Sequence, residues 1–296
     1  MLPRAVAQPL SAVLPQFEPP EKPIFLIGCP RSGTSILLRA LLESPSLRSI
    51  QSEGHILWDA YHHVRERDWE SDALGAKDVL PREREYIYAA VRLFVRQRRF
   101  VDKTPESCLR ISYLDALFPD ATFVFLRRRA ADNVNSLMEG WRARPRFVTY
   151  RLPQRLEGLG PLSGTTWSFV LIPGWRDLRS APLEEICARQ YVACNEAALS
   201  ARARLATDRW IDVAHEDLIE SPVETTRELY ERLELEPPNT GRKAAEVLAE
   251  LGPTALTPAK PQKWREQNRA EIERILPLVE PVEQRLYGAQ APGSSA

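Results

Sequence analysis

The sequence predicts an α/β fold with three layers, in which helices cover both faces of a central parallel sheet of about five strands. Apolar segments of strand character alternate with helical patterns along the chain. The segment Thr122–Leu126 is almost entirely apolar, as expected of a parallel strand that is covered on both faces. Residues 24–42 run from an apolar strand through a glycine-bounded turn into a helical pattern.

The turn in that first unit has the spacing of a phosphate-binding loop. Gly28, four residues, Gly33, Thr34 and Ser35 give the pattern G-x-x-x-x-G-T-S. Nucleoside triphosphatases carry Lys where Thr34 stands, so a triphosphate tail is disfavoured, and Arg31 supplies a cation from inside the loop. The fold is therefore expected to be of P-loop type. The expected anion-binding residues are Pro30, Arg31, Ser32, Gly33, Thr34 and Ser35.

The remaining elements follow in alternating order. Strands are expected at residues 23–27, 47–51, 99–101, 122–126 and 210–213. Helices are expected from residue 34 to about 44, over 55–67, 82–98, 106–118, 130–142 and 183–205, from 221–222 onward, and over 271–287. Residues 145–182 are expected to form a long loop, and residues 261–268 a second loop.

We expect one domain with short, poorly ordered ends. The domain is predicted over residues 23–288, with residues 141–182 as an insertion that forms an acceptor lid. Residues 1–23 hold six prolines, and we expect residues 1–22 to form a poorly ordered leader and residues 289–296 a disordered tail. The leader has no apolar core of the kind found in signal peptides, and no later stretch would span a membrane, so we expect a soluble, cytoplasmic protein.

Charge and cysteine usage exclude several classes of function. Forty basic residues balance forty acidic ones, which argues against a general binder of nucleic acid or anionic membranes. Only six of the forty basic residues are Lys, a bias that suggests a bacterial genome of high GC content. The four cysteines lack metal-ligand spacing, and we expect free thiols in a reducing compartment and no metal site.

Polar residues follow four of the expected strands. They are the loop at 28–35, Glu53, Lys103 and Arg127 to Arg129. Ligands of open α/β sheets bind outside the carboxyl ends of the strands, so these groups are expected to converge. The fourth strand ends in Arg where a Walker B strand ends in the Asp that holds Mg²⁺, which predicts a metal-free site for a ligand with several phosphate-like groups.

These motifs resemble those of the sulfotransferases that use 3′-phosphoadenosine 5′-phosphosulfate (PAPS). Pro-Arg-Ser-Gly-Thr-Ser at 30–35 is similar to the 5′-phosphosulfate loop of the bacterial, heparan and tyrosylprotein branches. Arg128 and Ser136, eight residues apart, match the pair that clamps the 3′-phosphate in that family, with Asp132 at the intervening position. The resemblance leaves open whether Arg127 and Arg129 make contacts.

The resemblance also implies catalytic residues. Asp102-Lys103-Thr104-Pro105 is similar to the family's acid-Lys-Thr-Pro segment, and Lys103 with Arg31 would stabilise charge on the transferred group and the departing phosphate. The cytosolic aryl branch has its catalytic His after Lys-Thr, where this chain has Pro105. Glu53 is the expected base that deprotonates the acceptor hydroxyl, and His55 is the alternative base or an orienting partner.

Three further segments indicate the function less specifically than these motifs. Residues 261–265 resemble a C-terminal loop that closes over the nucleotide, so Lys263 and Arg265 are expected phosphate contacts, while Trp264 is either a contact or packing. Residues 215–218 resemble a Tyr-Glu-Asp-Leu strand end and are expected to be mainly structural. The aromatic and basic side chains of residues 141–176 form either an acceptor surface or ordinary core and solvated charge.

The sequence thus predicts an enzyme that transfers a sulfuryl group from PAPS to a hydroxyl of a carbohydrate or small molecule, in line and without a metal. The alternatives are a P-loop kinase or nucleotidase and a non-catalytic nucleotide-binding module. Thr34 in the Lys position and Arg at the end of the fourth strand argue against the kinase.

Overall fold

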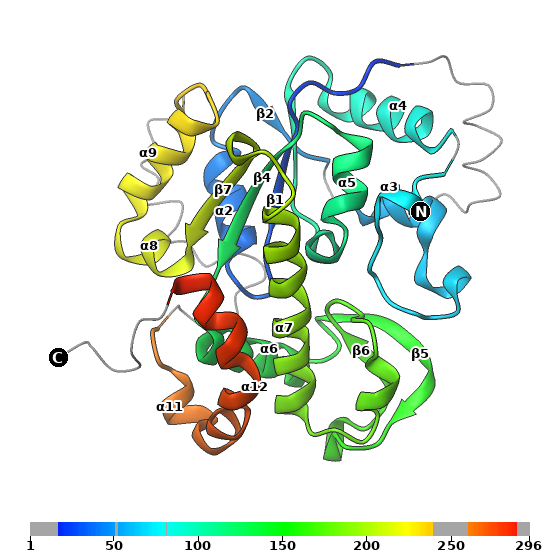
Figure 1. Ribbon diagram of the computed structural model, residues 1–296, viewed down its shortest axis with the longest axis vertical. Helices are drawn as coiled ribbons and strands as arrows, with labels where there is room; N and C mark the ends of the chain where they lie inside the picture. The colour runs from blue at the N-terminus through cyan, green and yellow to red at the C-terminus, as the bar shows by residue number, and fades with distance from the viewer. Residues whose placement is uncertain (1–16, 51–52, 81, 239–259, 289–296) are drawn as a thin grey trace.

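The computed structural model describes residues 17–50, 53–80, 82–238 and 260–288. Its centre is a parallel sheet of five strands in the order β2-β3-β1-β4-β7, which confirms the predicted α/β class (Figure 1). The strands are β1 (Ile24–Ile27), β2 (Leu47–Arg48), β3 (Arg99–Asp102), β4 (Thr122–Arg127) and β7 (Trp210–Ala214).

Helices occupy nearly all of the expected positions. The α-helices described are α2 (Thr34–Leu41), α3 (His55–His62), α4 (Glu83–Val95), α5 (Ile111–Leu117), α6 (Ala130–Arg142), α7 (Leu183–Arg202), α8 (His215–Glu220), α9 (Pro222–Arg232), α11 (Trp264–Gln267) and α12 (Arg269–Tyr287). Short 3₁₀ turns are η1 (Val64–Arg67), η2 (Ala76–Asp78), η3 (Pro105–Leu109), η4 (Gly160–Leu162), η5 (Trp175–Leu178) and η6 (Thr207–Arg209).

The two faces of the sheet carry different side chains. Along β1 and β4, Ile24, Leu26, Val124 and Leu126 face α2, α8 and α9, which form one layer. Alternate positions on the other face carry Phe25, Phe123 and Phe125 and pack against α3 to α7 and α12. Successive side chains of a strand point to opposite faces, so this division follows directly from the period of two.

The prediction of a long loop over residues 145–182 is wrong. The segment contains an antiparallel pair, β5 (Val148–Leu156) and β6 (Gly164–Ser168). Trp167 stacks edge-on against Trp141 and Trp175, with ring centroids 5.2 and 6.1 Å apart, and all three side chains are fully buried. These three rings therefore belong to the core, and a flat acceptor has no access to them.

Smaller differences lie at element boundaries. The helix expected over 106–118 begins as the 3₁₀ turn η3, which has Pro105 as its first residue, and the 261–268 segment contains the short helix α11. Of the expected leader, residues 1–16 lie outside the described residues, and Phe17 packs against the core. The expected tail at 289–296 also lies outside the described residues.

The four cysteines are free and buried, as expected. Cys108 of η3 and Cys194 of α7 have their sulfur atoms 3.2 Å apart. No helix in the described ranges is long and apolar enough to cross a membrane.

Candidate functional site

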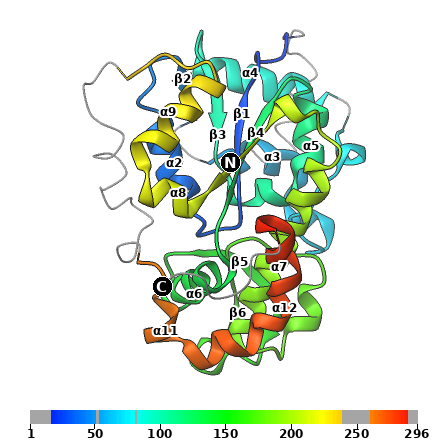
Figure 2. The same cartoon turned by 60° about the vertical axis from the view of Figure 1, so that its left-hand side comes forward.

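The carboxyl ends of the parallel strands bring the predicted site residues to one edge. Neighbouring strands β2, β3, β1 and β4 are followed by Glu53, Lys103, the 28–35 loop and Arg128. In Figures 1 and 2 the strands β1 and β4 run toward the part of the molecule that holds α6, α12 and the β5–β6 hairpin. The site therefore lies between the sheet edge and these elements.

The 28–35 loop has the backbone conformation of an anion cradle. Arg31 and Gly33 adopt positive φ values of 71° and 104°, and α2 starts directly after them at Thr34. Gly33 is required there, since a Cβ atom would lie 2.7 Å from Nδ1 of His215. The left-handed turn at the start of a helix directs backbone N–H groups toward a common point, which is how such loops hold phosphate-like groups.

Arg128 and Ser136 both contact Arg31. The Arg128 guanidinium donates to the Arg31 carbonyl oxygen at 2.7 Å, and Arg31 Nε donates to Ser136 Oγ at 3.3 Å. Asn133 of the same helix, α6, donates from Nδ2 to the Pro30 carbonyl at 2.9 Å. The start of α6 is thus fixed against the loop, and the residues expected at the two ends of the donor nucleotide form one connected group.

The loop region carries concentrated positive charge. Burial and the neighbouring Arg128 lower the pKa of Arg31 to about 10, and burial also lowers the pKa of Arg128. Glu139 is the acid that opposes the shift at Arg31. Ser32 Oγ and Arg128 Nε are buried and have no hydrogen-bond partner in the described chain. Two crowded guanidinium groups and unsatisfied donors suit an anionic ligand with more than one phosphate-like group.

His215 is a site residue whose position the sequence did not reveal. It follows β7, is 7% exposed, and packs against Gly33 of the loop. Burial and the positive charge of Arg128 lower the pKa of His215 to about 3, so the ring stays neutral and adds no charge to the cradle. Its place directly after a strand was the signal that would have indicated a role at the sheet edge.

The neighbouring arginines at the end of β4 contact helix α12. The guanidinium carbons of Arg127 and Arg129 lie 4.7 and 3.9 Å from the ring centroid of Tyr287 in α12. Tyr287 in turn donates its hydroxyl hydrogen to Glu216 at 3.0 Å. Arg127 and Arg129 therefore hold α12 against the end of β4, and Arg128 contacts the loop.

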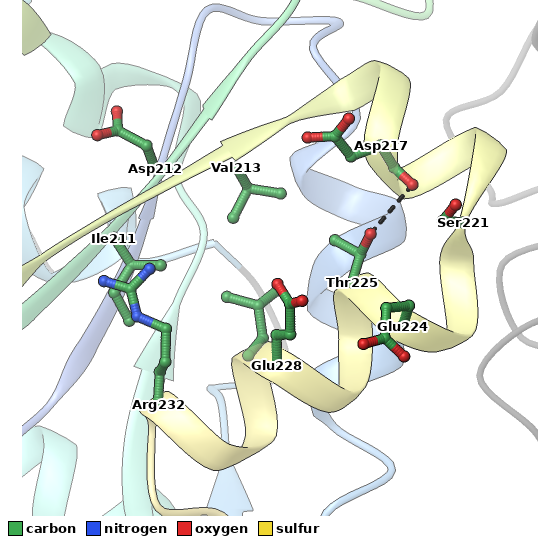
Figure 3. A pocket seen from close by; sticks show the side chains of 10 residues that line it. Ile211, Asp212, Val213, Asp217, Ser221, Glu224, Thr225, Glu228 and Arg232 are labelled. Carbon is green, nitrogen blue, oxygen red and sulfur yellow. Dashed lines mark hydrogen bonds between the residues drawn. The ribbon is translucent and has the colours of Figure 1, made fainter.

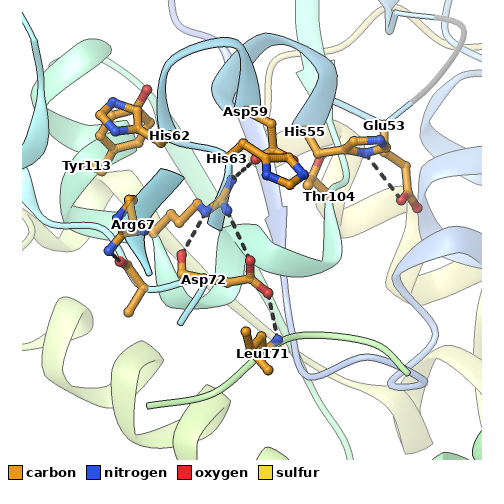
Figure 4. A network of polar contacts seen from close by, with 12 residues as sticks. Glu53, His55, Asp59, His62, His63, Arg67, Asp72, Thr104, Tyr113 and Leu171 are labelled. Atoms are coloured by element: carbon orange, nitrogen blue, oxygen red, sulfur yellow. Dashed lines mark hydrogen bonds and ion pairs between the residues drawn. The ribbon is translucent and has the colours of Figure 1, made fainter. Parts of the chain in front are cut away.

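The expected catalytic residues lie together beside the loop. Lys103 Nζ donates a hydrogen bond to Glu53 Oε1, and His55 Nδ1 lies 3.9 Å from Glu53 Oε2, as Figure 4 shows for Glu53 and His55. The side chains of Glu53 and His55 are 37% and 36% exposed, so a substrate can reach them, whereas Lys103 is only 9% exposed. Asp102 fixes the start of α3 by accepting from the Gly54 N–H at 2.9 Å.

The two residues expected in the C-terminal loop differ in position. Lys263 forms an ion pair of 2.6 Å with Glu139 of α6, one turn after Ser136, so it lies near the loop. Arg265 is exposed, lies over the Trp264 ring and donates to the Gln262 side chain. Trp264 is buried and serves packing.

A buried ion network that the sequence did not predict joins α3 to the hairpin segment (Figure 4). Arg110, with no exposed surface, pairs with Asp59 of α3 at 3.2 Å and with Asp72 at 3.3 Å. Asp72 also accepts from the Tyr150 hydroxyl at 2.6 Å and from the Leu171 N–H at 2.6 Å. One guanidinium thus connects α3, η3 and the β5–β6 hairpin.

A separate pocket lies between β7, α8 and α9 (Figure 3). Asp212, Asp217, Glu224 and Glu228 make its lining largely acidic, and Arg232 is its basic member. It is lined by none of the residues of the anion loop or of the Glu53–Lys103 pair.

Comparison with known proteins agrees with this geometry. A family model described as "Sulfotransferase family" matches residues 23–157. The match to this family covers a little under half of the chain. Nodulation protein NoeE of Sinorhizobium fredii is 28% identical over 142 residues, which are 44% of this chain and 33% of NoeE. The chain thus spans about one third of the length of this relative.

Solved sulfotransferase structures share the fold. Sulfotransferase STF9 from Mycobacterium avium has a TM-score of 0.53 at 15% identity, covering 93% of this chain and 79% of STF9. Mouse sulfotransferase SULT7A1, solved in complex with PAP, has a TM-score of 0.51 at 12% identity, covering 91% of this chain and 86% of the mouse protein. At these identities the likeness establishes the fold.

Proposed function

We propose that this chain is a PAPS-dependent sulfotransferase that transfers the sulfuryl group to a hydroxyl of a carbohydrate or small-molecule acceptor, without a metal ion. The match of residues 23–157 to the sulfotransferase family model supports the transfer of sulfate, and the PAP complex of the mouse sulfotransferase with the same fold supports PAPS as the donor. The observation that carries the proposal is that Arg128 and Ser136 both contact Arg31 in the anion loop.

The donor site would use the loop and the start of α6. The N–H groups that follow Ser32, together with the Arg31 guanidinium, would hold the 5′-phosphosulfate, and Arg128 and Ser136 would hold the 3′-phosphate. Thr34 and Ser35 begin α2 and add the helix N-terminus to the cradle. Lys263, paired with Glu139, is placed to reach a bound phosphate by exchanging one anionic partner for another.

Glu53 and Lys103 would carry the chemistry. Glu53 accepts the proton of the acceptor hydroxyl as its oxygen bonds to sulfur, and the bond from sulfur to the phosphate oxygen breaks, so that PAP leaves. Lys103 and Arg31 stabilise the negative charge that develops on the transferred group and the leaving phosphate. His55 orients Glu53 through the 3.9 Å contact or replaces it as base.

The acceptor would enter beside Glu53. The residues 141–182 would cover it, as part of one domain over residues 23–288. Since Trp141, Trp167 and Trp175 are buried in the core, half-buried Phe147 and the exposed polar face of the hairpin are the parts of this segment that an acceptor can contact.

A thermal-shift titration tests the donor site. PAP and ATP are compared, each with EDTA or with Mg²⁺. A ligand at about 100 times its dissociation constant should stabilise the protein by roughly 2.7 kcal/mol. We expect stabilisation by PAP in EDTA. Stabilisation by ATP with Mg²⁺ alone would contradict the proposal and favour a kinase or nucleotidase, and PAP binding without transfer to any of a broad set of hydroxyl acceptors would favour a binding module.

A further inference from the structure

Arg31 contacts an aromatic ring that belongs to the hairpin segment. Its guanidinium carbon lies 4.9 Å from the ring centroid of Phe147, within the range of a cation–π interaction. Phe147 directly precedes β5, more than a hundred residues after the anion loop. The contact therefore links the donor loop to the segment expected to cover the acceptor.

The Phe147 ring is itself held in place. It stacks on Phe169, with ring centroids 5.3 Å apart and an interplanar angle of 29°. Phe169 donates its backbone N–H to the Phe147 carbonyl at 3.2 Å and is 7% exposed. These two residues lie at the base of the hairpin, one before β5 and one after β6.

Two features of the backbone favour the stacking of Phe147 on Phe169. Phe169 has a positive φ of 63°, a conformation that is costly for a bulky residue and is maintained only by its surroundings. Gly140 of α6 leaves the space for its ring, because a Cβ atom there would lie 2.4 Å from Phe169 Cζ. Gly140 follows Glu139 on the helix that also carries Ser136, the side-chain partner of Arg31.

Arg31 needs such support because a second positive charge, that of Arg128, lies close to its guanidinium. Its backbone is in the left-handed region, at φ 71°, and Arg128 lies close enough to lower its pKa. The electron-rich face of an aromatic ring attracts a cation without adding a counter-charge that would compete with an anionic ligand. Glu139, in contrast, attracts Arg31 and also opposes anion binding.

We propose that Phe147 is a positioning residue for the donor site, which holds the Arg31 guanidinium in the anion loop through a cation–π interaction and is supported by Phe169 and Gly140. The inference rests on the proposed function, because Arg31 is taken as a contact of the donor. It assigns the hairpin segment a part in donor binding in addition to its proposed cover of the acceptor.

The test replaces Phe147 with 4-fluoro-, 3,5-difluoro- and 3,4,5-trifluorophenylalanine and measures PAP affinity by calorimetry. Fluorination withdraws electron density from the ring face while nearly preserving its shape. We expect the logarithm of the dissociation constant to rise steadily with fluorine number, and Phe147→Leu to weaken PAP binding roughly 3- to 10-fold. The same fluorinated series at Phe94, an exposed ring of α4, is the control and should leave the constant unchanged.

The possible results separate the two proposals. Wild-type binding of PAP with no trend along the fluorinated series would overturn the role of Phe147 and leave the proposed function intact. Tighter binding on fluorination would also overturn it, since Arg31 would then leave the ring when the ligand binds. If the wild-type protein did not bind PAP, both the donor site and this inference would be wrong.

Discussion

Lys103 donates a hydrogen bond to Glu53, joining the residue after β3 to the base candidate after β2. The pair places a cation and a carboxylate at the same partly open position, next to a loop that carries Arg31. A carboxylate held by a Lys is oriented before substrate arrives, and the Lys is near the place where negative charge develops. This relationship directs the first prediction.

Glu53→Gln should lower turnover by roughly 10²- to 10⁴-fold, because the amide cannot take the acceptor proton. PAP affinity should stay close to the wild-type value, as Glu53 makes no contact in the proposed donor site. Steady-state rates and calorimetry measure the two effects separately. Glu70→Gln, at a side chain that is 75% exposed, is the control. If His55→Asn lost as much turnover while Glu53→Gln did not, the base would be His55.

Arg128→Met should weaken PAP binding roughly 10- to 100-fold and affect adenosine 5′-phosphate less, because a charge-assisted contact to the 3′-phosphate is lost. Calorimetric titration of both nucleotides gives the ratio. Arg129→Met is a matched control from the same strand end, since Arg129 stacks on Tyr287 instead. An equal loss for both nucleotides would show that Arg128 does not distinguish the 3′-phosphate.

Glu139→Gln should strengthen PAP binding by roughly two- to fivefold, since it releases Lys263 and removes an acid near Arg31. Lys263→Met should have the opposite effect. The increase should shrink at high salt, which a titration at two ionic strengths detects. Glu266→Gln is the control, because Glu266 pairs with Lys260 at the same 2.6 Å on the exposed surface. Weaker PAP binding in Glu139→Gln would contradict this account.

Arg110→Met should destabilise the fold by about 3–5 kcal/mol, because it leaves the carboxylates of Asp59 and Asp72 buried without their cation. Urea unfolding followed by tryptophan fluorescence gives the free energy of unfolding. Arg204→Met, at an exposed arginine that donates to Ser112, is the control and should change it little. A loss below about 1 kcal/mol would mean that the network is not critical for stability.

Stability should fall as pH rises through the range set by Glu106. Burial, with the nearby carboxylate of Asp72, raises the pKa of Glu106 from its usual 4.5 to about 8. The native state therefore keeps a proton that the unfolded chain has lost between these values, so the free energy of unfolding decreases from pH 4.5 to about 8. Glu106→Gln removes this group, and its unfolding free energy should depend less on pH over that range. Equal slopes for the two proteins would contradict the assignment.

Much of the geometry of the candidate site could be predicted because its signals are local. Gly28, Gly33 and the helix after them are close in sequence, and the spacing of Arg128 and Ser136 lies within one strand–helix unit. The convergence of Glu53 and Lys103 with the loop followed from the parallel sheet, where strand ends share an edge.

The sequence did not predict strand β5 or the Arg110 network. The first has an alternation that turn-forming residues obscure, and the second joins residues that are distant in the chain. Pro153 within β5, and the glycines and prolines that follow the strand, obscured its alternation. Tyr150, Leu152 and Leu156 are nevertheless buried at alternate positions, with the half-buried Gln154 between the last two. The Arg110 network joins segments separated by about forty to eighty residues, and no local pattern specifies such partners.

The stacking of Arg127 and Arg129 on Tyr287 has a consequence for how the protein is made. The end of β4 is synthesised well before α12. The Tyr287 ring and the Leu286 carbonyl that accepts from Arg127 both belong to α12. Domains begin to fold from their N-terminal part during synthesis. We therefore expect the sheet of a nascent chain to assemble before α12 is available, so that Arg127 and Arg129 gain their contacts with Tyr287 only after the strand end has formed.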